Sequence, residues 1–181
     1  MKKTLVTGGC GFIGSNLVEH LLKKGYSIKV FDKYNFNNDW GWLEKSKYKN
    51  DLEVVLGDIR DFDSILNASK DCKNIIHLAA LIGIPYSYIS PLAYIKTNIE
   101  GTYNVLECSK FNNFDNIIIT STSEVYGSAE KVPISEDHRL LGQSPYSASK
   151  IGADQLAMSY YKSFNFPIKL IRPFNTFGPR Q

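Results

Sequence analysis

Two short segments of this 181-residue chain bring together side chains that could move protons. The first, Thr122-Ser123-Glu124, supplies a hydroxyl and a carboxylate, and the second, Tyr146-Ser147-Ala148-Ser149-Lys150, supplies a phenol and an ammonium. Residues four apart on a helix share one face, so Tyr146 and Lys150 should be neighbours. An ammonium favours the phenolate; lowering a phenol from a pKa of ~10 to near 7 takes roughly 4 kcal/mol. Glu124 is a further base that simple alcohol oxidation does not need.

The elements that must position these residues follow an alternating pattern. Strands are expected at 4–7, 27–31, 53–56, 74–77, 116–120 and 168–171, and helices at 11–24, 61–69, 91–112 and 144–163. Strands that alternate with helices indicate βαβ units. The predicted fold class is therefore α/β, a Rossmann-type, doubly wound parallel sheet with helices on both faces.

A glycine-rich turn, Gly8-Gly9-Cys10-Gly11-Phe12-Ile13-Gly14, joins the first expected strand to the first helix. Glycines allow a tight turn and close backbone approach, and the helix N-terminus offers N–H groups to a pyrophosphate. The spacing is GxxGxxG, one residue longer than the GxGxxG fingerprint. Its position between a strand and a helix predicts a dinucleotide site; the alternative is a glycine turn that binds nothing.

Carboxylates after the next two strands extend this prediction. Asp32 ends the second expected strand, about 20 residues beyond the glycines, where a carboxylate accepts the adenosine ribose hydroxyls. It would repel a 2′-phosphate, so NAD is favoured over NADP, although Lys33 weakens the preference. Asp58 could bind the adenine amino group, with Ile59 against the ring, or it could cap the following helix.

Three further segments have weaker assignments. Leu78-Ala79-Ala80 follows the fourth strand and lets a cofactor approach the backbone, whereas His77 is expected to be a packed core residue. Tyr86 could line a substrate cleft. Trp40-Gly41-Trp42 could cover adenine or contact another subunit, but an aromatic anchor for a loop is the simpler interpretation.

Composition excludes several classes of function. The net charge of +3 is small and the lysines are scattered, so no nucleic-acid partner is predicted. No stretch reaches the ~20 apolar residues of a membrane helix, and the apolar run near the N-terminus is too short for a signal peptide. The three cysteines and three histidines lack metal-ligand spacing. We therefore expect a cytoplasmic protein with reduced thiols, no metal site and no membrane partner.

At these residues the chain resembles an extended short-chain dehydrogenase/reductase that modifies nucleotide sugars. The resemblance runs from the glycine turn to Arg172-Pro173-Phe174-Asn175-Thr176-Phe177-Gly178-Pro179-Arg180. It is greatest to the 4,6-dehydratases, in particular those acting on UDP- or GDP-linked N-acetylglucosamine in legionaminic-acid-type pathways. The stretches that carry this similarity are 35–42, 81–88, 120–127 and 143–147.

The resemblance implies roles for individual residues. The catalytic set would be Thr122, Glu124, Tyr146 and Lys150, with Ser123 where some 4,6-dehydratases have an Asp that protonates the leaving water. Substrate contacts would come from Thr122, Tyr146, Asn175 and Tyr86. The expected cofactor contacts are Gly8, Gly11, Phe12, Ile13, Gly14, Asp32, Asp58, Ile59, Leu78, Ala79, Ala80, Thr120, Tyr146, Lys150 and Pro173.

The implied reaction is redox-neutral, with NAD as the resident cofactor. Tyr146 would take the proton of the sugar 4-hydroxyl, Glu124 would take the C5 proton of the ketone, and water would leave from C6 to give a 4-keto-6-deoxy sugar nucleotide. Alternatives are a nucleotide-sugar 4-epimerase, which has no use for a C5 base, and a UDP-glucuronate decarboxylase. A rival of another class is an NAD-binding module without catalysis.

The resemblance also bears on domain organisation. The family continues into a C-terminal segment that holds the nucleotide sugar, whereas this chain ends in loop-like sequence at Gln181. Residues 1–181 are thus expected to be an NAD-binding Rossmann domain that lacks most of the substrate domain. A homodimer built on helices 91–112 and 144–163 is implied as well.

Overall fold

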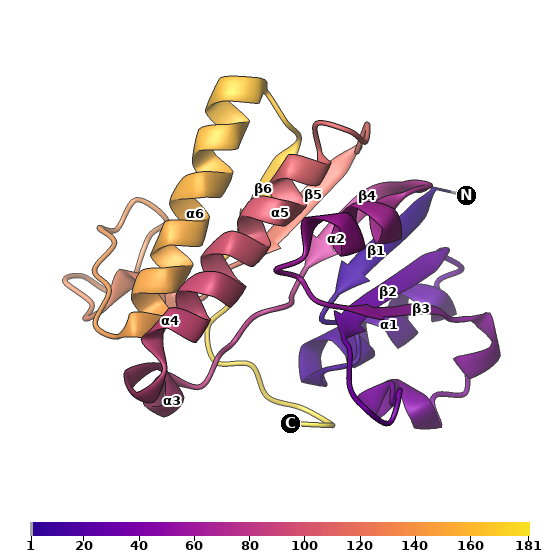
Figure 1. Cartoon of the computed structure of the whole chain (residues 1–181). Helices are drawn as coiled ribbons and strands as arrows, with labels where there is room; N and C mark the ends of the chain where they lie inside the picture. Colours follow the sequence, from indigo (N-terminus) through magenta and orange to yellow (C-terminus); the bar gives the residue numbers. More distant parts are fainter. Residues whose placement is uncertain (1) are drawn as a thin grey trace.

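A six-stranded parallel sheet forms the centre of the computed structural model, which describes residues 2–181 (Figure 1). The strand order is β3-β2-β1-β4-β5-β6, and every neighbouring pair is parallel. All six predicted strands are present, and the predicted fold class is confirmed. The strands are β1 (Lys3–Thr7), β2 (Ile28–Lys33), β3 (Glu53–Gly57), β4 (Cys72–His77), β5 (Asn116–Thr120) and β6 (Ile168–Ile171).

Alternation along the strands divides the apolar residues between two cores. Leu5, Ile75 and Ile117 point to the face covered by α2 (Phe62–Ser69), α5 (Gly101–Cys108) and α6 (Pro145–Phe164). Val6 and Val30 point to the opposite face, against α1 (Phe12–Lys23). Successive side chains of a strand face opposite sides, so one sheet buries two layers of helices. Figure 1 shows α2, α5 and α6 on the near face.

The predicted helix at 91–112 is wrong in detail. It consists of α4 (Pro91–Tyr94), a π-type segment, η3 (Ile95–Glu100), and α5, which ends at Cys108. In η3 the buried Asn98 bonds both backbone groups of Leu81, at 2.8 and 2.9 Å. A wider turn of this kind is often found at functional sites, and here it carries the buried Asn98. A short helix before it, α3 (Ile84–Ile89), was not predicted.

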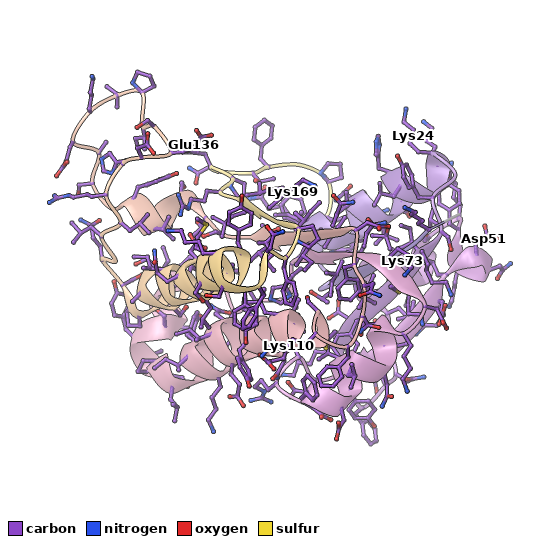
Figure 2. The ribbon with its side chains drawn as sticks, turned by 90° about the horizontal axis from the view of Figure 1, so that it is seen from above. Lys24, Asp51, Lys73, Lys110, Glu136 and Lys169 are labelled. Atoms are coloured by element: carbon purple, nitrogen blue, oxygen red, sulfur yellow. The ribbon has the colours of Figure 1, made fainter. Side chains whose placement is uncertain are left out.

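Two 3-10 turns, η1 (Gly41–Lys45) and η2 (Lys49–Asp51), lie in the loop after β2. Trp40 packs partly buried against the α1 core, in agreement with an aromatic anchor, whereas Trp42 is half exposed. The long connection between β5 and α6 extends beyond the sheet, and Figure 2 shows Glu136 on the side of the molecule away from Lys24 and Asp51. Among residues 2–181 the longest apolar helices fall short of what a membrane crossing requires.

Candidate active site

A cavity of about 840 Å³ lies at the carboxyl ends of the strands. Its walls come from the segments that follow β1, β2, β3, β4, β5 and β6, because parallel strands bring these segments to one edge of the sheet. The lining contains the whole set predicted from the sequence: Gly8, Gly11, Phe12, Ile13, Gly14, Asp32, Asp58, Ile59, Leu78, Ala79, Ala80, Tyr86, Thr120, Thr122, Ser123, Glu124, Tyr146, Lys150, Pro173 and Asn175.

The glycines of the turn allow its backbone to pack closely against the neighbouring segments at the edge of the cavity. Gly8 has a φ of +70°, and a Cβ there would lie 2.7 Å from the backbone nitrogen of Ala79. A Cβ on Gly14 would overlap the carbonyl oxygen of Gly8. Within residues 2–181 no side chain caps the start of α1, so its first N–H groups remain available to an anion. The turn therefore fits a dinucleotide pyrophosphate.

Asp32 ties the glycine turn to β2. One carboxylate oxygen accepts the N–H of Cys10 at 2.6 Å, and the other accepts the N–H of Lys33 at 2.7 Å. The strand continues through Lys33 instead of ending at Asp32 as predicted. A second recess of about 430 Å³ shares Gly11, Asp32 and Lys33 with the main cavity. Each oxygen of Asp32 keeps a lone pair, so the side chain can still accept ribose hydroxyls.

Asp58 does not cap the helix that follows it. Asp61 does so, since its carboxylate accepts the N–H groups of Asp63 and Ser64. The carboxylate of Asp58 instead pairs with Arg60, with Nη2 to Oδ2 at 2.5 Å, and this hydrogen-bonded pair holds the pKa of Asp58 below its usual range. The prediction that Asp58 caps the helix is thus wrong. Asp58 lines the cavity, and its binding to the adenine amino group stays a prediction.

His77 is a core residue, as expected. It is 2% exposed, and its ring nitrogens lie 2.7 Å from the hydroxyl of Thr7 and 3.2 Å from that of Thr102. Burial, and to a smaller extent the charge of Lys150, lower the pKa of His77 to about 3. The imidazole is therefore neutral and holds β1, β4 and α5 together.

The four reactive side chains come from two neighbouring elements. Thr122 caps the 3-10 turn η4 (Ser123–Tyr126), its hydroxyl accepting the N–H of Glu124 at 3.2 Å. Tyr146 and Lys150 lie in the first turns of α6, where Ser144 and Ser147 form a capping box. The ammonium of Lys150 donates to the carbonyl oxygen of Thr120 at 2.6 Å. The η4 turn, which follows β5, and helix α6 thus bring all four groups to the same cavity.

Electrostatics at this wall differ from the sequence-based expectation. Burial raises the pKa of Tyr146, the hydroxyl of Thr122 opposes the rise, and the charge of Glu124 adds to it. Burial also lowers the pKa of Lys150 to about 8, with the carboxylate of Asp154 opposing. Burial, the largest cause, therefore opposes the phenolate that the spacing of Tyr146 and Lys150 predicts.

One buried residue that shapes the cavity was missed. Asn98 is 1% exposed, and besides Leu81 it donates to the hydroxyl of Ser149 at 2.9 Å. It thereby fixes the cavity-lining Leu81 to helix α6. Nothing in the sequence signals this role, since a lone Asn in a helical pattern has no spacing partner.

The sheet order, the glycine turn after β1 and the cavity at the strand ends define a dinucleotide-binding α/β protein. The chain belongs to the GDP-mannose 4,6 dehydratase family, whose family model matches residues 5–181. The extended short-chain dehydrogenase/reductase resemblance is thus confirmed at the level of the family.

Two similar proteins match nearly the whole of this chain but only about half of their own length. The low-salt glycan biosynthesis protein Agl12 of Haloferax volcanii is 35% identical over 98% of this chain and 57% of its own length. The dTDP-D-glucose 4,6-dehydratase of Dictyostelium discoideum is 35% identical over 100% of this chain and 45% of its own. The chain therefore spans about half the length of these relatives.

Solved structures agree with this picture. The dTDP-glucose 4,6-dehydratase DesIV of Streptomyces venezuelae, with NAD and TYD bound, has a TM-score of 0.89 at 32% identity, over 99% of this chain and 57% of DesIV. The UDP-N-acetylglucosamine 4-epimerase of Methanobrevibacter ruminantium, in complex with UDP-N-acetylmuramic acid, also has a TM-score of 0.89, at 33% identity and the same coverage. The fold is thus common to dehydratases and epimerases.

Proposed function

We propose that this chain is the NAD-binding part of a nucleotide-sugar 4,6-dehydratase. The observation that carries the proposal is that Glu124 lines the same cavity as Thr122, Tyr146 and Lys150, with its charge close enough to raise the pKa of Tyr146. A dehydratase needs two bases, one for the 4-hydroxyl and one for C5. An oxidation at C4 alone needs one.

The cofactor proposal rests on fit. The glycine turn would hold the pyrophosphate and Asp32 the adenosine ribose, which favours NAD because a carboxylate repels a 2′-phosphate. NAD, when bound in this cavity, would supply a hydride acceptor that also returns the hydride, together with a positive ring charge. Solved relatives of this chain contain NAD.

The chain's own residues would do the proton chemistry. Tyr146 takes the proton of the 4-hydroxyl, and the hydroxyl of Thr122 orients that oxygen. The C4 ketone acidifies the C5 proton, which passes to the carboxylate of Glu124. Ser123 offers only a hydroxyl, so the newly protonated Glu124 is the acid proposed to return this proton to the leaving C6 hydroxyl. Glu124 then holds no proton, so the proton that C5 regains when C6 is reduced would come from Tyr146, which returns the proton of the 4-hydroxyl. Both residues thereby recover their starting states, and the net loss is one water.

The substrate is proposed as a UDP- or GDP-linked hexose, with N-acetylglucosamine as the expected sugar. Asn175 and Tyr86, which line the same cavity as Glu124, would contact it. Two of the relatives named above are described as enzymes of dTDP-D-glucose and of UDP-N-acetylglucosamine. The test must therefore include UDP-, GDP- and dTDP-linked sugars. Because the chain spans about half of those relatives, the full-length protein is the one to assay.

The decisive experiment is mass spectrometry of products from a panel of UDP-, GDP- and dTDP-hexoses incubated with the full-length protein and NAD. Loss of one water from one sugar is expected. In Glu124→Gln, the 4-keto sugar should form without water loss. A 4-epimerase is the second candidate, supported by the equally similar epimerase fold. Isomerised sugar of unchanged mass, undiminished in Glu124→Gln, would exclude the dehydratase.

A homodimer is proposed as well, on the family resemblance and one supporting observation. Helices α4, η3 and α6 carry apolar side chains that are 36–59% exposed: Leu92, Ile95, Met158 and Tyr161. Exposed apolar residues gathered on neighbouring helices are typical of protein contacts. Sedimentation of the full-length protein, compared with Leu92→Lys and Ile95→Lys, tests this assembly.

A further inference from the structure

A buried ion pair lies behind the wall that carries the reactive side chains. Asp154 on α6 is completely buried, and its Oδ2 accepts a hydrogen bond from Nε of Arg172 at 2.9 Å. Nη1 of Arg172 donates to the phenol of Tyr126 at 3.1 Å, and the guanidinium carbon lies 5.2 Å from the centroid of that ring. Neither Asp154 nor Arg172 lines the cavity.

The pair connects the three elements that supply the site. Asp154 lies one helical turn after Lys150 on α6, and Tyr126 ends the η4 turn that begins at Ser123. Arg172 follows β6 directly and precedes the cavity-lining Pro173, whose carbonyl oxygen accepts the N–H of Ser123 at 3.0 Å. A shift of the guanidinium would therefore displace its contacts with helix α6, with the turn that carries Glu124 and with the segment that leads to Asn175.

The charges of this region are unbalanced without Asp154. Lys150 and Arg172 are cations with little exposure, and Asp154 is the carboxylate that lies between them. Its second oxygen, Oδ1, and the hydroxyl of Ser121 have no hydrogen-bond partner within residues 2–181. Of the other titratable groups, His77 from β4 interacts with the charge of Lys150 and is neutral, while Tyr146 from α6 and Glu124 from η4 line the same cavity as Lys150.

We propose that Asp154 and Arg172 are positioning residues of the active site: the pair fixes the turn with Glu124 and the segment with Asn175 against helix α6, and Asp154 places a buried carboxylate one helical turn from the ammonium of Lys150. This inference rests on the proposed dehydratase function for its catalytic consequence. A purely structural pair would only stabilise the fold. A positioning pair must also affect the geometry and the charge of a cavity that it does not touch.

Single substitutions cannot separate the two roles, because breaking a buried ion pair leaves an unpaired charge and is strongly destabilising. Replacing both partners with apolar residues of similar volume is often neutral or stabilising. The test variant is therefore Asp154→Leu combined with Arg172→Met, alongside Asp154→Asn. Glu53→Gln is the control, since it removes a half-exposed carboxylate that pairs with Lys3 and with buried Lys29 and does not line the cavity.

In full-length protein, the double variant should regain the melting temperature of the parent, while kcat falls about 100-fold and KM changes little, as expected for misplacement of catalytic groups. Asp154→Asn, assayed where it remains folded, should move the alkaline limb of the pH–rate profile to lower pH, because Lys150 loses its counter-charge. A stable double variant with parental kcat and pH profile would overturn the inference.

A second readout does not depend on turnover. Hydrogen exchange of the peptides that span 121–127 and 171–177 should be faster in the stable double variant than in the parent, and unchanged in Glu53→Gln. Unchanged exchange in the double variant would overturn the positioning role even if no substrate were found. Conversely, a parent protein that turns over none of the sugars while its exchange pattern behaves as expected would refute the proposed function and leave the positioning pair in place.

Discussion

The buried histidine at the end of β4 should make the fold acid-sensitive. His77 is 2% exposed and bonded by Thr7 and Thr102, and burial lowers its pKa from 6.5 to about 3. Because the unfolded chain takes up the proton more readily, this contribution to stability is complete above pH 6.5 and is lost as the pH falls toward 3. Each pH unit in that window is worth about 1.4 kcal/mol. Acidification from neutral pH to about pH 4 should remove about 3 kcal/mol through this residue alone.

Urea unfolding at neutral pH and at about pH 4 measures this loss. The variant His77→Gln keeps hydrogen-bonding groups for the two threonines but cannot titrate, so its stability should fall about 3 kcal/mol less between the two pH values than that of the parent. His20→Gln, at an exposed position of α1, is the matched control for loss of a histidine. Carboxylate titration is common to all three proteins and cancels. Parallel losses in the parent and in His77→Gln would refute the reasoning.

Three further predictions follow from the site and its supports. Gly8→Ala should weaken NAD binding at least about tenfold by calorimetry, because its Cβ would press on Ala79, whereas Gly25→Ala, at a similar φ of +82° but in open space, should strain the fold and leave affinity unchanged. Asp61→Ala should cost about 1 kcal/mol in urea unfolding through loss of the α2 cap, and Asp58→Ala clearly less. Tyr146→Phe should abolish turnover while NAD affinity stays within about threefold; turnover near the parental rate would show that this phenol is not the base.

The sequence predicts the sheet and the cavity wall well for a physical reason. Each strand contains Val or Ile and lies between turn residues, so a local pattern indicates its presence. Once the strands are parallel and in one sheet, the residues that follow them must meet at one edge. Positions as distant as Gly8 and Asn175 could therefore be assigned to the same cavity.

Features that depend on a single tertiary contact could not be predicted. The π-type segment contains Asn98, which bonds to Leu81, 17 residues earlier in the chain. No local sequence pattern predicts that pairing. The helix cap at Asp61 instead of Asp58 depends on where α2 begins, to within a few residues, and boundaries of this kind are the least certain part of a sequence pattern. Asp154 and Arg172 likewise look like ordinary surface charges until the fold buries them together.

The protonation of Tyr146 shows why spacing does not determine chemistry. Four residues on a helix bring Lys150 near the phenol, but the same packing that fixes both side chains also removes water from them, and burial opposes charge on each. Within this chain the result is a protonated phenol beside a carboxylate and an ammonium. A protonated Tyr146 removes a proton poorly until a further positive charge in the cavity stabilises its phenolate. A redox-neutral enzyme of the proposed kind gains from this, because its base becomes effective only when the hydride acceptor is already in position.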